Sequence, residues 1–335
     1  MKLLFVADPL ESFKTYKDTT YAMMRAAQAR GHEVHACEAR ELQWARGGHV
    51  GARVRRIELV DPLPDADAHG HDAWFRVLHD SGVRAPVPLM RHDAVVMRKD
   101  PPFDNEYFYA THLLEQAERE GAKVFNRPSA LRNHPEKLSI LEFPQFITPT
   151  LVSRDAEALK AFHAEHHDVI FKPLDGMGGA GIFRVGPDGL NLGAIVETLN
   201  AFGRHTVMAQ RYLPEIAHGD KRVLLIGGVP VPHALARIPQ GSEIRGNLAA
   251  GGKGVAQPLG GRDRQIAEHL GPLLAARGLL LVGLDVIGPC LTEINVTSPT
   301  GFQEIMKQTG FDVAGMFLDA LEAAVAAPSA PAARA

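Results

Sequence analysis

Apolar and polar positions follow a regular order over the first 128 residues. Short apolar runs, which predict buried strands, alternate with longer segments whose apolar residues recur at helical spacing. The predicted strands lie at residues 2–8, 33–39, 94–100 and 123–128, and the predicted helices at 18–30 and 106–121. Such alternation is typical of a parallel sheet with helices on its faces, so the chain is expected to begin with an α/β domain.

Local signals refine this first part of the chain. Asp18 or Thr19 is expected to cap the first helix, and Gly31 to end it. The segment 47–88 mixes Gly, Pro, His and charges of both signs, which predicts irregular structure with some helix near Trp74. A ligand is expected beyond the carboxyl ends of the parallel strands.

The pattern changes after residue 128. A helical section at 129–143 and a helix at 156–167 are followed by short strands joined by tight turns. These strands are predicted at 169–173, 181–185, 206–213, 221–228, 229–238, 281–288 and 291–297, with further helices near 190–200 and 263–277. This arrangement is typical of an antiparallel α+β domain. The Ala/Pro-rich end, residues 323–335, is expected to be disordered.

Composition and charge narrow the class of protein. A chain of 335 residues is too long for one core, so two or three subdomains are expected. The net charge is −3, and the basic run at 46–56 is followed at once by acidic residues, so no nucleic-acid partner is predicted. Two cysteines exclude a disulfide framework. The apolar runs at 3–7 and 279–288 are too short for a signal peptide or a membrane span, which predicts a cytoplasmic protein without a membrane partner.

Four glycines crowd into the sequence KPLDGMGGAGI at residues 172–182. Glycine runs let backbone N–H groups converge on phosphate. Neither a Walker A loop nor the dinucleotide fingerprint fits, because Lys172 precedes the glycines and predicted strands flank them on both sides. The pattern predicts a hairpin whose tip covers a ligand. A mobile hairpin without a ligand is the alternative that this stretch leaves open.

A second predicted hairpin carries three oxygen-bearing side chains. Glu293 and Asn295 share a face because they are two residues apart on one strand. Folding the hairpin about Pro289 brings Asp285 opposite Glu293. Two facing carboxylates require a cation or a proton, and an oxygen-only donor set suits Mg²⁺. The sequence therefore predicts a magnesium site, with an exposed surface hairpin as the alternative.

Five stretches of sequence support a family assignment. KPLDGMGG, MRKDPPFD, HGDKR, ARIPQGSEIRGNLAAGGKG and the pair GLDVIG and LTEINVTSPTG resemble, in matching order, the bacterial glutathione synthetases of the ATP-grasp superfamily. The resemblance is weakest at 47–88 and in the C-terminal tail. It implies an ATP-grasp fold of mixed α/β and α+β class. The implied parts are an N-terminal Rossmann-like domain at 1–128, a central lid subdomain at 129–209, a C-terminal subdomain at 210–322 and a tail at 323–335.

The resemblance also implies a nucleotide site and a metal site. The glycine hairpin would cover the phosphates of ATP, two lysines would reach the phosphate oxygens, and the backbone after residue 209 would bind adenine. The implied nucleotide-binding residues are Lys137, Lys172, Gly176, Gly178, Gly179, Gln210, Tyr212, Leu213 and Asp220. The implied ligands of Mg²⁺, with Mn²⁺ as the alternative metal, are Asp285, Glu293 and Asn295.

The implied reaction joins γ-glutamylcysteine to glycine and converts ATP to ADP and phosphate through an acyl phosphate. Both substrates carry carboxylates, which arginine binds with two parallel hydrogen bonds. The candidate catalytic residues are Arg222, Arg237 and Arg245, and the candidate substrate-binding residues are Arg98, Arg222, Arg237, Asn295, Ser298 and Thr300. For Arg222 and Arg237 a structural salt bridge stays open as the alternative. The family's tetramer is the expected oligomeric state.

Three rival functions stay open on the sequence. Another ATP-grasp ligase would join a different carboxylate to a different amine, a regulatory protein would keep the fold without turnover, and a kinase would transfer phosphate alone. By resemblance, the sequences SPTG at 298–301 and KDTT at 17–20 favour the peptide substrate. A regulatory protein has no need for three metal ligands and a glycine-rich hairpin.

The loop at 241–254 contains five glycines in fourteen residues, with Arg245 and Lys253 as its cations. So many glycines disfavour a packed helix or strand. We expect a lid that is mobile and protease-sensitive without ligands and that keeps water from the acyl phosphate when it closes. A surface loop without this role is the alternative.

Overall fold

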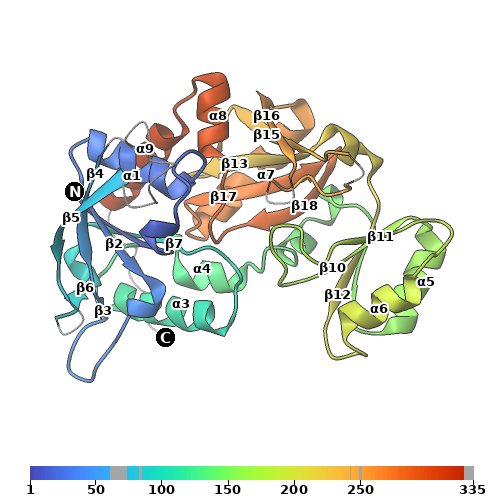
Figure 1. Cartoon of the computed structure of the whole chain (residues 1–335), viewed down its shortest axis with the longest axis horizontal. Helices are drawn as coiled ribbons and strands as arrows, with labels where there is room; N and C mark the ends of the chain where they lie inside the picture. The colour runs from blue at the N-terminus through green and yellow to red at the C-terminus, as the bar shows by residue number, and fades with distance from the viewer. Residues whose placement is uncertain (61–73, 83–84, 242, 249–250, 328–335) are drawn as a thin grey trace.

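Three main sheets follow one another along the chain. The computed structural model describes residues 1–60, 74–82, 85–241, 243–248 and 251–327. In Figure 1 the N-terminal sheet lies at the left, the central sheet at the right and the C-terminal sheet between them. No helix in the described ranges combines the length and the apolar character needed to cross a membrane.

The N-terminal sheet has the strand order β5-β4-β2-β1-β7-β8. Its parallel strands are β1 (Lys2–Ala7), β2 (Glu33–Glu38), β7 (Ala94–Arg98) and β8 (Val124–Phe125), and its main helices are α1 (Thr19–Ala29) and α3 (Asn105–Arg119). The predicted strand–helix alternation is confirmed. Asp18 caps α1, because its side chain accepts a hydrogen bond from the Tyr21 N–H at 2.7 Å.

The described residues within 47–88, a segment predicted to be irregular, form four short strands. β4 (Arg55–Leu59) and β5 (Phe75–Asp80) form the antiparallel edge of the N-terminal sheet, and β3 (Gly51–Ala52) pairs with β6 (Val87–Pro88). The prediction was wrong because the alternation in β4 is short, with charged residues around two buried apolar ones. Some helix was expected near Trp74, but strand β5 begins directly after this residue, and residues 61–73 before it lie outside the described residues.

A buried histidine, His92, lies beside the N-terminal sheet and contacts the partly buried His35 of β2. His92 Nδ1 donates to the Leu89 carbonyl at 3.2 Å, so its Nε2, which lies 3.2 Å from His35 Nδ1, accepts a hydrogen bond in the neutral ring. Burial, together with the neighbouring His35, lowers the pKa of His92 from 6.5 to about 4. His92 is therefore neutral in the folded protein between these two pH values, where the unfolded chain would protonate it.

We expect the free energy of unfolding to fall as the pH is lowered from 6.5 to about 4. The unfolded chain then binds a proton at His92 that the folded chain does not, and the contribution of this group reaches roughly 3 kcal/mol. Chemical denaturation at several pH values measures it. His92→Gln should flatten the pH dependence, and His205→Gln, at an exposed position, should not. Equal slopes for the wild type and His92→Gln would contradict the expectation.

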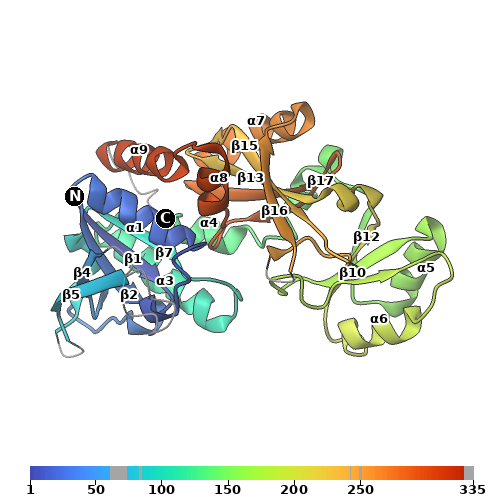
Figure 2. The same ribbon diagram turned by 45° about the horizontal axis from the view of Figure 1, so that its top comes forward.

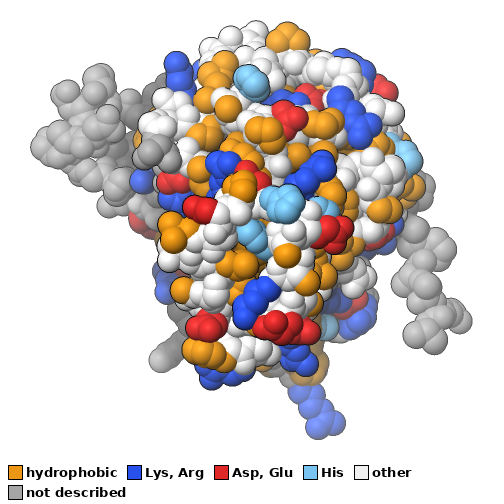
Figure 3. Space-filling model, turned by 90° about the vertical axis from the view of Figure 1, so that its right-hand side faces the viewer, with side chains coloured by type: hydrophobic (Ala, Val, Ile, Leu, Met, Phe, Trp, Pro, Cys, Tyr) orange, Lys and Arg blue, Asp and Glu red, His pale blue; other side chains and the backbone are white. Residues whose placement is uncertain are grey.

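The central sheet is antiparallel, with the strand order β11-β10-β12-β9. Its strands are β9 (Thr150–Ser153), β10 (Val169–Pro173), β11 (Phe183–Val185) and β12 (Val207–Arg211), packed against α5 (Ala156–His166) and α6 (Leu192–Asn200). The helical section before it consists of α4 (Pro128–Asn133) and two 3₁₀ turns. Figure 3 views this end of the molecule, where basic and acidic side chains are interspersed.

The C-terminal sheet has the order β16-β15-β13-β17-β18, with β14 paired to β13. Its elements are β13 (Asp220–Ile226), β14 (Val229–Pro230), β15 (His233–Ile238), β16 (Lys253–Pro258), β17 (Leu281–Ile287), β18 (Cys290–Asn295) and the covering helix α7 (Gly261–Ala276). All its strand pairs are antiparallel, as predicted. Because β13 is central, its side chains meet those of β15 and β17.

The chain ends by returning to its N-terminal part. After α8 (Phe302–Thr309), helix α9 (Val313–Ala326) packs against α1, as Figure 2 shows. Arg30 forms an ion pair with Asp319 at 2.7 Å. The disordered tail predicted at 323–335 was wrong for 323–326, because Ala324 and Val325 continue the apolar face of α9. Residues 328–335 lie outside the described residues.

Candidate active site

A cavity of about 520 Å³ lies where the three sheets meet. Its wall includes the tip of the glycine hairpin, the chain at 210–213, the strands β13, β15, β17 and β18, and the loop at 298–300. The loops after β1 and β7 contribute residues at 12–18 and 100–101, which agrees with a ligand beyond the carboxyl ends of parallel strands. The volume is that of a small-molecule site.

The glycine-rich stretch forms the predicted hairpin. β10 and β11 pair antiparallel, with Phe171 opposite Phe183. In the tip between them Gly179 has φ +84° and comes so close to the 241–254 loop that a Cβ there would lie 2.7 Å from Asn247 Oδ1. The Gly179 carbonyl accepts a hydrogen bond from Arg245 Nη1 at 3.1 Å. The two glycine-rich segments therefore contact each other over the cavity; residues 242, 249 and 250 of the loop are outside the described residues.

Two buried lysines face a carboxylate from β18. Lys172 and Lys137 are 4% and 6% exposed, and their Nζ atoms lie 3.5 and 3.9 Å from Glu293 Oε1. Burial lowers the pKa of Lys172, and Glu293 opposes this effect. Lys137 Nζ also donates to the Gly176 carbonyl at 2.6 Å. Buried ammonium groups at the wall of a cavity favour an anionic ligand, since a phosphate would satisfy both charge and hydrogen bonds.

The carboxylate hairpin, residues 281–297, has the predicted register. Asp285 is paired with Glu293, and Gly283 with Asn295, across β17 and β18. In the described ranges no three His, Cys, Asp or Glu side chains gather closely enough to hold a metal alone. Oxygen atoms of Asn295 or of a ligand are therefore needed to complete a site. The oxygen-only donor set fits a hard divalent cation.

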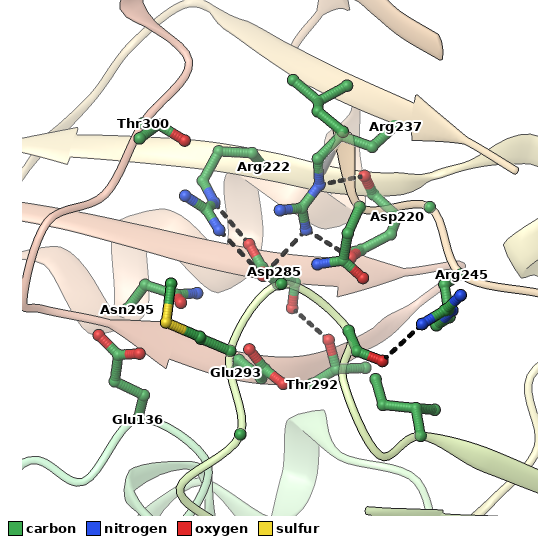
Figure 4. Close-up of a pocket in the computed structure, with 18 of the residues that line it drawn as sticks. Glu136, Asp220, Arg222, Arg237, Arg245, Asp285, Thr292, Glu293, Asn295 and Thr300 are labelled. Carbon is green, nitrogen blue, oxygen red and sulfur yellow. Dashed lines mark hydrogen bonds and ion pairs between the residues drawn. The ribbon is translucent and has the colours of Figure 1, made fainter. Parts of the chain in front are cut away.

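Two arginines neutralise the carboxylates at the centre of the cavity (Figure 4). Asp285 Oδ1 accepts from Arg222 Nε at 2.6 Å, Asp285 Oδ2 lies 2.9 Å from Arg237 Nη2, and Arg237 also pairs with Asp220. Burial would raise the pKa of Asp285, but the two arginines outweigh it and hold that pKa well below its usual range. Burial raises the pKa of Asp220 despite its arginine partner.

Arg222 and Arg237 therefore form structural salt bridges, the alternative that the sequence left open for them. Both side chains also line the cavity. Asp220 Oδ1 is buried and has no hydrogen-bond partner among the described residues. An unpartnered carboxylate oxygen beside Asp285 is consistent with a cation or a protonated ligand group at this position.

Arg98, predicted to bind a substrate carboxylate, lies behind the cavity wall. Its Nε donates to Thr20 Oγ1 at 3.0 Å and its Nη2 to the Pro299 carbonyl at 3.2 Å. Its Nη1 has no partner within the described part of the chain. Arg98 is 4% exposed and supports the loop that carries Ser298 and Thr300. Direct contact with a substrate stays a prediction.

The other residues predicted for the site all line the cavity. They are Lys137, Lys172, Gly176, Gly178, Gly179, Gln210, Tyr212, Leu213, Asp220, Arg222, Arg237, Arg245, Asp285, Glu293, Asn295, Ser298 and Thr300. Their individual roles stay predictions, because lining a cavity does not show what a side chain binds.

Sequence reasoning missed Glu136 and Thr292, which also line the cavity. Thr292 Oγ1 donates to the Asp285 carbonyl at 3.1 Å and so ties the two strands of the carboxylate hairpin. Glu136 accepts hydrogen bonds from a segment about 160 positions away. Its position directly before Lys137 was the available signal, and no local pattern indicates so distant a partner.

Both halves of the chain match one protein family. Residues 1–132 match the family described as "Prokaryotic glutathione synthetase, N-terminal domain", and residues 136–310 match "Prokaryotic glutathione synthetase, ATP-grasp domain". The chain belongs to the prokaryotic glutathione synthetase family. The family resemblance and the ATP-grasp fold are thereby confirmed, and the ATP-grasp domain implies binding of ATP and Mg²⁺.

Glutathione synthetases of several bacteria are similar to this chain over nearly their whole length. The chain is 60% identical over 324 residues to that of Ralstonia nicotianae, covering 97% of this chain and 96% of the relative. It is 58% identical over 323 residues to that of Neisseria meningitidis serogroup B, covering 96% and 98%. These identities show a glutathione synthetase function, that of an ATP-dependent ligase.

A more distant structure shares the fold of this glutathione synthetase family member. The crystal structure of a D-cycloserine synthetase has a TM-score of 0.66, with 18% identity, and the match covers 97% of this chain and 100% of the other. At this level of identity the comparison shows the fold alone.

Proposed function

We propose that the chain joins γ-glutamylcysteine to glycine through an acyl phosphate held in the central cavity. The observation that carries the proposal is one cavity lined by two buried lysines, two facing carboxylates and four arginines, among them Arg222, Arg237 and Arg245. Phosphoryl transfer needs alignment and charge neutralisation more than a covalent protein group. The arrangement supplies both.

In the first step the γ-phosphoryl group of ATP moves to an oxygen of the cysteinyl carboxylate, and ADP leaves. Lys137 and Lys172 would bind the phosphate oxygens, which the tip of the glycine hairpin would cover. The residues proposed for nucleotide binding are Gly176, Gly178, Gly179, Gln210, Tyr212, Leu213 and Asp220. Bound Mg²⁺, or Mn²⁺ in its place, would neutralise phosphate charge, and Asp285, Glu293 and Asn295 are the residues that would hold it.

In the second step the glycine amine attacks the acyl carbon, phosphate leaves, and the nitrogen loses its proton. Arg222 and Arg237 would stabilise the negative charge of the tetrahedral intermediate, because their guanidinium groups already share Asp285 and lie at the cavity wall. Ser298 and Thr300 would bind substrate carboxylates by their hydroxyl groups, in a loop that Arg98 supports. Arg245, on the loop at 241–254, would close onto the transferring phosphoryl group or the substrate carboxylate.

Two further features belong to the same proposal. The unpaired cysteines, Cys37 and Cys290, are compatible with a reducing cytoplasm. A tetramer is inferred from the family resemblance, with γ-glutamylcysteine and glycine as the small-molecule partners. Neither a nucleic acid nor a membrane has a part in the proposed activity.

Release of ADP is expected to depend on the peptide substrate. Purified protein with Mg²⁺ and ATP should release ADP when γ-glutamylcysteine is added, and should form one glutathione per ADP when glycine is also present. A coupled ADP assay together with chromatographic detection of glutathione measures both. Steady ADP release without either substrate, or none with both, would contradict the proposed reaction.

A further inference from the structure

Glu136 connects two parts of the site that are far apart in sequence. Its side-chain Oε1 accepts hydrogen bonds from the Val296 N–H at 3.0 Å, the Thr297 N–H at 3.1 Å and Thr297 Oγ1 at 2.8 Å. Its backbone carbonyl accepts from the Ile294 N–H at 2.9 Å. These donors flank Asn295, where strand β18 ends. The backbone N–H groups of Val296 and Thr297, which lie beyond the end of the strand, donate to the Glu136 carboxylate instead of to a neighbouring strand.

The residue that follows Glu136 faces the glycine hairpin. Lys137 Nζ donates to the Gly176 carbonyl and lies 3.9 Å from Glu293 Oε1. Adjacent residues thus contact the end of the carboxylate hairpin and the tip of the glycine hairpin. In Figure 4 Glu136 lies across from Asn295, on the side of Asp285 opposite Arg237.

A carboxylate at this position has an electrostatic cost. Glu293 lies close enough to Glu136 for the two charges to repel, and two facing carboxylates already stand on the hairpin. A neutral side chain could accept hydrogen bonds from this segment without adding charge. The carboxylate is useful where strong, charge-assisted hydrogen bonds must hold a backbone segment in one position.

We infer that Glu136 is a positioning residue. It fixes Asn295 and the following loop relative to Lys137, and so holds the proposed metal ligands in place relative to the proposed phosphate-binding lysine. This inference rests on the proposed metal and nucleotide roles. It predicts that Glu136 affects the binding of a divalent cation to the nucleotide complex, although Glu136 acts through the segment it holds.

The test measures Mn²⁺ binding to the enzyme–ADP complex by electron paramagnetic resonance, without turnover. Glu136→Gln keeps the volume and loses the charge, and should raise the dissociation constant of Mn²⁺ about tenfold. Glu142→Gln is the matched control, since Glu142 follows in the same segment and pairs with Arg277 at the surface. It should bind Mn²⁺ as the wild type does.

Two variants of Thr297 keep the test decisive if Glu136→Gln does not fold. Thr297→Val removes one of the three hydrogen bonds to Glu136 Oε1 and should weaken Mn²⁺ binding about threefold. Thr297→Ser keeps the hydroxyl group and should bind Mn²⁺ as the wild type does. Unchanged Mn²⁺ affinity in folded Glu136→Gln, or in Thr297→Val, would overturn the inference, and a lowered melting temperature alone would show a merely structural bond.

The inference and the proposed reaction fail in different ways. A wild type that forms no glutathione, but whose Mn²⁺ affinity depends on Glu136, would refute the reaction and leave the positioning role intact. A wild type that forms glutathione, with Mn²⁺ affinity indifferent to Glu136, would refute the positioning role.

Discussion

Glu293→Gln is expected to lower kcat for glutathione formation about 100-fold or more. The substitution removes one negative charge from the proposed metal site at nearly constant volume. It also removes the counter-ion of Lys172 and Lys137, which lie 3.5 and 3.9 Å from Glu293 Oε1. The Mg²⁺ concentration that gives half-maximal activity should rise, because fewer protein charges hold the cation.

Steady-state rates over a range of Mg²⁺ concentrations measure this effect, with the melting temperature as the check on folding. Glu268→Gln, an exposed residue of α7 that pairs with Arg264, is the matched control and should behave as the wild type. Near wild-type rates and Mg²⁺ dependence in Glu293→Gln would show that the facing carboxylates of the hairpin are not a metal site.

Arg245→Ala is expected to separate ATP hydrolysis from ligation. Arg245 Nη1 binds the Gly179 carbonyl, and its Nη2 lies 2.5 Å from Glu243 Oε2, which holds the pKa of Glu243 at about 2. The side chain thus joins the two glycine-rich segments over the cavity. Its loss should let water reach the acyl phosphate, so the ligation rate should fall roughly tenfold to 100-fold.

The ratio of glutathione formed to ADP released measures this uncoupling directly. Lys253→Ala removes the other cation of the same loop, at the first residue of β16, and should leave the ratio close to one. Arg245→Lys should recover part of the coupling, since an ammonium group replaces the charge but not the planar pair of donors. A ratio near one in Arg245→Ala would show that the contact with Gly179 has no part in protecting the intermediate.

The carboxylate hairpin was predictable because its geometry is local. Residues two apart on a strand share a face, and a Gly-Pro turn sets the register, so the pairing of Asp285 with Glu293 follows from a few neighbouring positions. The α/β order of the first domain was predictable for the same reason. The nucleotide-binding roles proposed for Lys172 and for the chain at 210–213 rest on the family resemblance as well.

What the sequence did not reveal depends on distant partners. The hydrogen bonds accepted by Glu136 join positions about 160 residues apart. The salt bridges of Arg237 arise only when β13 lies between β15 and β17. The location of Arg98 behind Pro299 depends on how the N-terminal sheet meets the loop at 298–300. Strand β4 was missed because two buried positions are too few to establish a period.

The packing of α9 against α1 has a consequence for synthesis on the ribosome. Leu3 and Phe5 of β1 and Met23 of α1 share one hydrophobic core with Phe317 and Leu321 of α9. A nascent chain that has emerged only as far as β8 therefore still exposes apolar surface that α9 covers later. Domains generally fold in order from the N-terminus during synthesis, but this core is complete only when α9 has been made. Residues of β1 and α1, which leave the ribosome well before α9, are therefore among the last to be enclosed.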